Sequence, residues 1–493
     1  MVSLFDYEET IAFLGQWGRF QQIVFFLLCA SIMPNGFGAF SVVFLTDVQS
    51  HHCIVPEVNL TQDWRNGCVD GWSYSKDIYQ STLVSEFDLV CRDQWKQPFT
   101  ATVYFLGFVV GSFFSGQLSD RFGRKLVFFA TMAVQTVFTF VQIFSPSWTV
   151  FSILHFISGL GQISNYVSTF VLGTEILTGN VRVLFSSLGV CLGFAIGYMV
   201  LPLFAYFLRD WKSLVIAISL PGLLYIPLWR FIPESPRWLL SQGRVEEAEA
   251  IVREAAKRNR VEAPLVIFED YRELPNVFNL LRTRNIRNTT VILSLVWFTL
   301  TTGYFGLSLN TSRLHANPYI SCFISAAVEV PAYISSWLAL QYLTRRLSVI
   351  CILLLGGVSL LLITLVPQTL SELSVALEML GKFGITTCSS LMYVYTAELY
   401  PTVLRNTATG VCSTASRIGS CIAPFLLQLS QYYKYLPYIT LGTLAAGSAF
   451  AALFLPETFG QPLPQTIQQM HKRERWRDTS HPSEKTHFGR LYP

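Results

Sequence analysis

Charged side chains are scarce in this sequence. Asp, Glu, Lys and Arg make up 13% of its 493 residues, whereas an average soluble domain has about 25%. Hydrophobic residues make up 52%, which is more apolar surface than soluble domains of ordinary size can bury. The composition excludes an ordinary water-soluble protein and indicates a chain that a lipid bilayer solvates.

The sequence also lacks the motifs of common enzymes and metal sites. It has no HExxH or GxSxG motif, and Gln117 stands where a phosphate-binding loop beginning at Gly111 would need a lysine. Its ten cysteines form no CxxC pair, and its net charge of +4 is modest and spread along the chain. We therefore expect no enzymatic activity, no cofactor, no structural or catalytic metal and no nucleic-acid partner.

Long apolar runs are abundant instead. They recur with polar breaks between them, and a bilayer-crossing helix needs about 20 such residues. The run that follows Arg19 extends to about Leu45, which is too long for the core of a cleaved signal peptide. We predict an all-α membrane protein with twelve crossings, centred near residues 32, 108, 135, 160, 195, 221, 299, 331, 356, 385, 417 and 445.

Basic residues predict how these helices are oriented. Lys and Arg gather after the even-numbered helices, as the positive-inside rule expects of cytoplasmic loops. Both termini are then cytoplasmic, and the loop at residues 46–98 is extracellular. That loop carries a glycosylation sequon at Asn59 and three cysteines, and the sequence does not choose which two of them pair: Cys53, Cys68 and Cys91.

An internal repeat divides the chain. Glu175 and Glu398 are 223 residues apart, and each is followed seven residues later by an arginine. The same offset relates Glu234 and Glu457, each within a Pro-Glu-Ser/Thr motif. A parallel duplication of six helices places a substrate site between the halves near mid-membrane. The predicted parts are a first half at 1–232, a cytoplasmic helical loop at 233–288, a second half at 289–458 and a cytoplasmic tail at 459–493.

The charged residues of the repeat are candidates for a gate. Ion pairs that form at one stage of a transport cycle and break at another can act as a latch, and static helix caps are the alternative. The basic turn at residues 116–125 belongs to this set, whereas the second half keeps only Arg345 and Arg346 there, which predicts a degenerate latch. The gating candidates are Asp120, Arg121, Arg124, Glu175, Arg182, Glu234, Glu398, Arg405 and Glu457.

Several runs resemble one known family. The turn GQLSDRFGRK (116–125) resembles the signature loop of the major facilitator superfamily. Other runs resemble the organic cation/carnitine transporter branch of solute carrier family 22, namely ASIMPNGF (30–37), LGQISNYV (160–167), LPLFAYFLRDW (201–211), IPESPRWLL (232–240), YVYTAELYPTVLRN (393–406) and STASRIGS (413–420).

This resemblance implies the major facilitator fold and plasma-membrane uptake of carnitine or a related zwitterionic betaine by alternating access. It also implies sodium as the coupling ion, and membrane lipid as a partner. An ergothioneine transporter or a broad organic cation carrier is the alternative within the family. A membrane receptor or channel fits twelve helices with a parallel repeat poorly. The chain departs from the branch in its shorter first extracellular loop and in its ending at Pro493, which weakens the expectation of a PDZ scaffold.

Arg417 is the predicted carboxylate ligand. It lies in the middle of the eleventh apolar run, where a charge costs about 2.5–3.5 kcal/mol and should face a cavity or a partner. A guanidinium can hold a carboxylate in two parallel hydrogen bonds. The alternative is an ion pair of Arg417 with Glu378 or Glu329. We predict instead that Glu378 pairs with Lys382 near the membrane face.

The remaining candidates follow from the chemistry of a betaine. A trimethylammonium group donates no hydrogen bond, so aromatic faces should hold it, although core packing is the alternative for each. Sodium accepts neutral oxygen ligands, and ordinary interhelical hydrogen bonding is the alternative there. The substrate candidates are Asn165, Tyr166, Trp297, Tyr304 and Tyr393, and the sodium candidates are Asn35, Gln135 and Gln162.

Overall fold

The computed structural model describes residues 7–54, 68, 71–268, 284–313, 317–400 and 402–459. Within this part of the chain, nine helical segments are long and apolar enough to cross a membrane. Three further helices contain the other predicted centres, namely α7 (Trp148–Ile176), α17 (Ser371–Leu399) and the shorter apolar α19 (Leu436–Ala452). All twelve predicted centres lie in these helices, so the predicted all-α membrane fold is confirmed.

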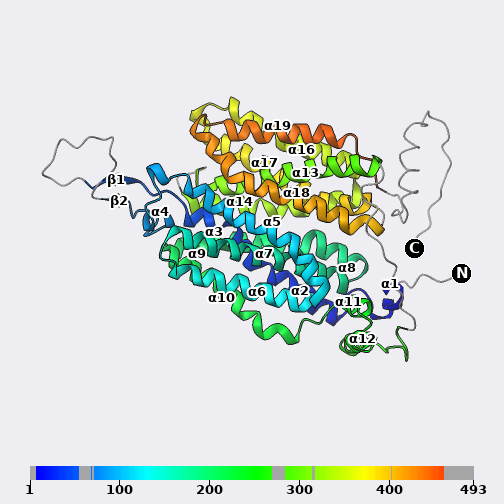
Figure 1. Ribbon diagram of the computed structural model, residues 1–493. Helices are drawn as coiled ribbons and strands as arrows, with labels where there is room; N and C mark the ends of the chain where they lie inside the picture. Colours follow the sequence, from blue (N-terminus) through cyan, green and yellow to red (C-terminus); the bar gives the residue numbers. More distant parts are fainter. Residues whose placement is uncertain are drawn as a thin grey trace, which may run out of the picture.

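The crossings form two sets of six, which Figure 1 shows as two layers. The first set comprises α2 (Arg19–Ser31) with α3 (Met33–Leu45), α5 (Lys96–Phe122), α6 (Arg124–Val141), α7, α8 (Gly179–Leu184) with α9 (Val190–Phe207), and α10 (Trp211–Leu224). The second comprises α13 (Arg284–Leu309), α14 (Pro318–Ala327) with α15 (Glu329–Tyr342), α16 (Arg345–Leu362), α17, α18 (Thr402–Gln428) and α19. The two sets meet where α5 packs against α18 and α9 against α14.

Close backbone contact joins α5 to α7 in the first half. A Cβ atom added to Gly107 would lie 2.4 Å from the carbonyl oxygen of Phe156. One added to Gly159 would lie 2.4 Å from the carbonyl oxygen of Tyr104. Because neither glycine has a side chain, the two helix backbones can approach closely where they cross, as is common at small residues between membrane helices.

Two short strands and a disulfide lie at one end of the bundle, here named the loop end. Strands β1 (His51–Cys53) and β2 (Trp72–Tyr74) pair antiparallel, and α4 (Leu83–Glu86) follows them (Figure 1). Of the three loop cysteines, Cys53 bonds to Cys68 with a Cα–Cα distance of 5.4 Å, while Cys91 is an exposed free thiol. The sequon Asn59 lies outside the described residues.

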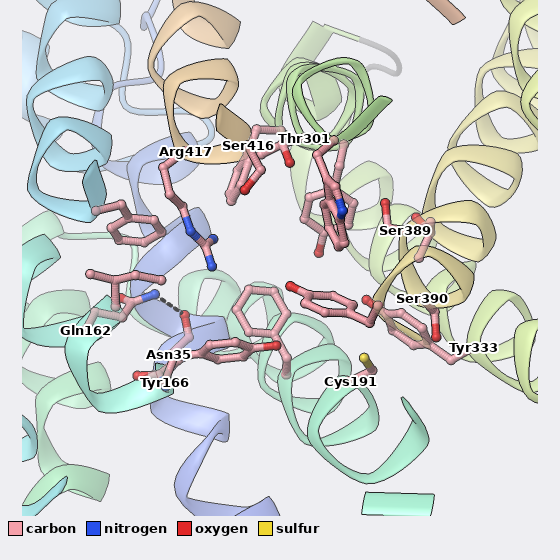
Figure 2. A pocket seen from close by; sticks show the side chains of 18 residues that line it. Asn35, Gln162, Tyr166, Cys191, Thr301, Tyr333, Ser389, Ser390, Ser416 and Arg417 are labelled. Carbon is pink, nitrogen blue, oxygen red and sulfur yellow. Dashed lines mark hydrogen bonds between the residues drawn. The ribbon is translucent and has the colours of Figure 1, made fainter. Parts of the chain in front are cut away.

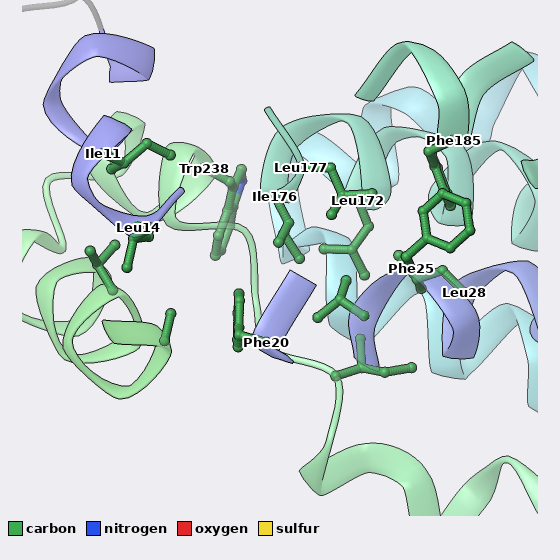
Figure 3. Packing of buried hydrophobic residues seen from close by; sticks show 14 of the residues in the cluster. Ile11, Leu14, Phe20, Phe25, Leu28, Leu172, Ile176, Leu177, Phe185 and Trp238 are labelled. Carbon is green, nitrogen blue, oxygen red and sulfur yellow. The ribbon is translucent and has the colours of Figure 1, made fainter. Parts of the chain in front are cut away.

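A small helical cap covers the opposite end, here named the cap end. It contains α1 (Tyr7–Thr10), α11 (Pro236–Ser241) and α12 (Val245–Asn259). Side chains of this cap pack against the ends of α2 and α7 in one apolar cluster (Figure 3), which includes Ile11, Leu14, Phe20, Leu172, Ile176 and Trp238. The cap is further joined to α2 because the Asn259 side chain accepts from the Phe20 backbone N–H at 2.9 Å.

Aromatic contacts between the halves close the loop end. Tyr319 of α14 stacks on Phe44 of α3, with ring centroids 5.6 Å apart. Deeper in the bundle, Phe305 of α13 packs against Phe105 of α5 at 4.6 Å and against Phe40 of α3 at 5.8 Å. These rings cover the central cavity from the loop end.

Candidate substrate site

A cavity of about 120 Å³ lies between the two halves. Helices α3, α5, α7 and α9 line it from the first half, and α13, α15, α17 and α18 from the second (Figure 2). Its wall includes seven of the residues predicted from the sequence, namely Asn35, Gln162, Tyr166, Trp297, Tyr304, Tyr393 and Arg417. Asn165 and Gln135 do not line it.

Arg417 of α18 directs its guanidinium group into the cavity (Figure 2). Its Nε has no hydrogen-bond partner in the described part of the protein, and none of the carboxylates described there lies within ion-pair distance. The neighbouring hydroxyl of Ser420 donates back to its own helix, to the carbonyl oxygen of Arg417 at 2.6 Å. The guanidinium is therefore placed to bind an anionic group that enters the cavity.

Aromatic rings form much of the remaining wall. Trp297 and Tyr393 meet edge to face with ring centroids 4.7 Å apart. The indole N–H of Trp297 is bonded to Thr396 at 3.1 Å, and the hydroxyl of Tyr304 donates to Glu329 at 2.8 Å. These bonds fix the polar edges of both rings and leave ring surface facing the cavity, which suits a methylated cation.

A completely buried ion pair lies behind this wall. Lys382 of α17 bonds to Glu329 of α15 at 3.2 Å, and both side chains have 0% exposure. Its Nζ also donates to Ser325 at 2.5 Å and lies 4.6 Å from the ring centroid of Tyr198. The predicted Lys382–Glu378 pair is therefore wrong, since Lys382 points across to α15 at full depth. The predicted alternative for Arg417, pairing with either glutamate, is not formed either.

A chain of side-chain amides runs from the cavity into the first half. Gln162 donates from Nε2 to the backbone oxygen of Asn35 at 2.7 Å (Figure 2), and Asn35 donates to Asn165 at 3.3 Å. Asn165 in turn donates to the backbone oxygen of Phe128 at 3.1 Å. The Oδ1 atom of Asn35 is buried without a partner among the described residues, so it is a spare oxygen ligand.

Gln135 lies apart from that chain. It is buried on α6, where its backbone nitrogen would lie 2.9 Å from a Cβ added to Gly161. Its Oε1 is also buried without a partner in the described part of the chain. The structure brings Asn35 and Gln162 together but does not bring Gln135 to them.

The gating candidates of the first half meet at the cap end. Arg124 bonds to Glu175 at 3.1 Å and to Asp120 at 2.7 Å. The carboxylate of Glu234 accepts from the backbone N–H groups of Arg124 and Lys125, both at 3.0 Å, and burial raises the pKa of Glu234. Glu175 thus pairs with Arg124 and not with the arginine that follows it seven residues later in the sequence.

The neighbouring arginines take other roles. The Nε atom of Arg182 donates to the backbone oxygen of Leu177 at 2.9 Å. Arg121 is exposed, and its guanidinium lies 5.5 Å from the ring centroid of Phe122. The side chain of Arg405 lies outside the described side chains.

The second half repeats this network, contrary to the predicted degeneracy. Arg345 bonds to Glu398 at 3.3 Å, as Arg124 does to Glu175. The carboxylate of Glu457 accepts from the backbone N–H groups of Arg345 at 2.8 Å and Arg346 at 3.0 Å. Arg345 takes the place of Arg124, because its backbone N–H binds Glu457 while its side chain binds Glu398.

Comparison with known proteins identifies the family. Residues 58–470 match the family model of sugar (and other) transporters. The chain is 50% identical over 522 residues to organic cation/carnitine transporter 2 of Mus musculus, with 94% of each chain covered. It is also 50% identical to solute carrier family 22 member 4 of Mus musculus, with 95% of each covered.

The chain belongs to the organic cation/carnitine transporter branch of solute carrier family 22. The chain is therefore a membrane transporter and not an enzyme. It also has the fold of the xylose transporter XylE from E. coli in a partially occluded inward open conformation, with a TM-score of 0.63 at 17% identity, covering 90% of this chain and 99% of that one.

In this solute carrier, reasoning from the sequence missed part of the cavity wall. Tyr333, Phe108, Phe194 and Phe305 line it beside the predicted residues. The chain has 39 phenylalanines and 21 tyrosines, so no local pattern distinguishes these four from core residues. The Glu329–Lys382 ion pair was not predicted either, because the two residues are 53 positions apart. The one sequence feature that indicates it is a charged residue within the apolar run of each helix.

Proposed function

We propose that the chain is a plasma-membrane carrier that takes up carnitine and related zwitterionic betaines. The proposal is supported by two relatives, one named as an organic cation/carnitine transporter and the other as an organic cation transporter. One is the Mus musculus protein described above, and the other is the organic cation transporter protein of Drosophila melanogaster, 32% identical over 94% of each chain. The observation that carries the proposal is the guanidinium of Arg417 in a cavity whose other walls are aromatic.

The two ends of a betaine fit different parts of this cavity. The carboxylate binds Arg417 through paired, charge-assisted hydrogen bonds. The trimethylammonium group packs against ring faces of Tyr166, Trp297, Tyr304 and Tyr393. Asn165 contacts no substrate in this arrangement but holds Asn35 in place. A cation without a carboxylate would leave Arg417 unpaired, which disfavours a broad organic cation carrier.

Sodium is the proposed coupling ion. The unpartnered Oδ1 of Asn35 is a neutral oxygen ligand beside Pro34, where the first crossing is interrupted between α2 and α3. Gln162 supports this position by holding the backbone oxygen of Asn35. Gln135 offers a second oxygen without a partner among the described residues. It lies on α6, so it would have to move toward Asn35 to share one sodium ion with it. Neutral oxygens suit a hard monovalent cation.

Alternating access would move the two halves as bodies, with proposed boundaries at 1–232 and 289–458. Each carboxylate–arginine network joins the ends of crossings that belong to one half, and Glu234 of the first network lies just past residue 232. We assign these networks to gating, because they fix the helix ends that approach and separate. We further propose that the cap end, with its basic residues, faces the cytoplasm and that the loop end faces the outside of the cell.

Competitive uptake tests the substrate and the coupling ion together. Proteoliposomes that contain the purified chain receive labelled L-carnitine, with unlabelled carnitine, ergothioneine or tetraethylammonium as competitors, in sodium or choline medium. The proposal expects saturable carnitine uptake that the two betaines inhibit, that tetraethylammonium inhibits weakly, and that falls without sodium. Stronger competition by ergothioneine than by unlabelled carnitine identifies ergothioneine as the preferred substrate. Equal inhibition by tetraethylammonium would refute selection for zwitterions.

A further inference from the structure

A buried carboxylate without a cationic partner lies in the second turn of α17. The side chain of Glu378 is 1% exposed. Its Oε1 accepts from Asn310 Nδ2 at 3.1 Å, and its Oε2 accepts from the hydroxyl of Tyr438 at 2.7 Å. Asn310 Nδ2 also donates to that hydroxyl at 2.8 Å, which closes a triangle of three side chains. In the described chain, no Lys, Arg or His lies within ion-pair distance of Glu378.

The nearest cation is already occupied. Lys382 lies one helical turn further along α17, and it bonds to Glu329 and Ser325. Lys382 therefore pairs with Glu329, and Glu378 has no cation within ion-pair distance among the described residues. A buried ionised carboxylate in that position is strongly disfavoured, and it must either gain a proton or bind a cation.

The other surroundings of Glu378 supply no compensating charge. The end of α13 contributes the neutral Asn310, and α19 contributes Tyr438. Helix α16 presents apolar Leu360, which lies against Gly381 on the same helix as the carboxylate. Arg417 opens on the cavity and forms no ion pair with Glu378. Both hydrogen-bond partners of the acid in the described part of the chain are thus neutral.

We propose that Glu378 binds a proton during the transport cycle, as a second coupling ion beside sodium. A proton is favoured over a metal cation because both carboxyl oxygens already accept bonds from N–H and O–H donors. A metal ion would need several free oxygen ligands in their place. The step is a simple association, in which the carboxylate and one proton form a neutral carboxylic acid.

A connected set of side chains links this acid to the substrate cavity. Lys382 lies between Glu378 and Glu329, and Glu329 accepts the hydroxyl of Tyr304, which lines the cavity. When Glu378 is ionised, it competes with Glu329 for the ammonium group of Lys382. Protonation ends this competition and strengthens the hold on Tyr304. Tyr438 is partly exposed at the start of α19, so protons reach the acid from the loop end.

Infrared difference spectroscopy tests the proton site without any substrate. Purified protein without substrate is compared at about pH 5 and about pH 8. The proposal expects the wild-type protein to show the carbonyl stretch of one protonated carboxylic acid at low pH and to lose this band at high pH. The band should be absent from Glu378→Gln. The matched control is Glu372→Gln, which changes an exposed acid at the start of the same helix and should retain the band. A band that persists in Glu378→Gln, or is absent from the wild type, overturns the proposal.

Uptake measurements then test coupling, and this arm rests on the proposed function. An inward proton gradient should stimulate uptake of labelled carnitine in wild type and Glu372→Gln, and leave Glu378→Gln unaffected. Tyr438→Phe removes one donor to the carboxylate and should move the midpoint of the pH profile upward by about one unit. Stimulation of Glu378→Gln equal to wild type refutes coupling. If no carnitine is transported, the proposed function fails while the infrared result still decides the proton site.

Discussion

Replacing Lys382 with methionine tests how the membrane interior holds charge. The substitution keeps the length and apolar stem of the side chain but removes the ammonium group. Glu329 would then remain at 0% exposure without its cation. Removing one partner of a buried pair costs about 3–5 kcal/mol, because the other charge is left uncompensated.

The same geometry at the surface provides the control. Arg253 and Glu249 on α12 are 2.5 Å apart, closer than Lys382 and Glu329, but their side chains are 42% and 24% exposed. An exposed pair contributes about 0–1 kcal/mol. Arg253→Met should therefore lower the free energy of unfolding far less than Lys382→Met does, even though Arg253→Met breaks the shorter of the two ion pairs.

Unfolding by a denaturing detergent in mixed micelles gives the free energies for comparison. We expect wild type and Arg253→Met to have similar free energies of unfolding, and the free energy of unfolding of Lys382→Met to be lower by about 3–5 kcal/mol. The double variant Lys382→Met with Glu329→Gln should recover part of this loss, because no unpaired charge remains. Equal losses for Lys382→Met and Arg253→Met, or no recovery in the double variant, would refute the reasoning.

Three further predictions concern packing, the gate and the loop. Gly107→Ala should destabilise by about 1–3 kcal/mol because its Cβ meets the backbone of α7, whereas Gly116→Ala on the same helix meets nothing within 4 Å and should be neutral or stabilising in thermal unfolding; equal midpoints would contradict this. Arg124→Gln and Arg345→Gln should each reduce the maximal rate of carnitine uptake by a similar factor, of about tenfold or more, with substrate affinity changed little, and a strong loss from only one of them would disprove the equivalence of the two networks. Cys91→Ser should leave surface expression unchanged while Cys53→Ser lowers it, as surface biotinylation would measure, and the reverse pattern would contradict the Cys53–Cys68 pairing.

The membrane fold could be predicted from the sequence because its signals are local. Twelve apolar runs and a 223-residue repeat are visible without any contact information. Arg417 was predicted to face a cavity for a similar reason, since a charge in the middle of an apolar run has few other places to go. The predicted helical loop at 233–288 contains α12, where Glu254 and Arg258, four residues apart on the helix, form an ion pair at 3.0 Å.

The partnerships between helices could not be predicted in this way. Glu175 has an arginine seven residues away in sequence but pairs with one 51 residues away, because the ends of α6 and α7 meet in space. Lys382 has a glutamate one turn away on its own helix and still pairs across to α15. Which of two nearby carboxylates pairs with a cation depends on how the helices are rotated and packed. The spacing of residues along the sequence does not predict either property.

Uptake by Arg417→Ala tests the central claim most directly. Labelled carnitine and labelled tetraethylammonium, a cation without a carboxylate, are measured side by side in proteoliposomes with wild-type and variant protein. The account predicts that carnitine uptake falls by about 100-fold in kcat/KM, equivalent to roughly 3 kcal/mol of paired hydrogen bonds, while tetraethylammonium uptake is unchanged or rises. Unchanged carnitine uptake, or an equal fall for both compounds, would contradict it.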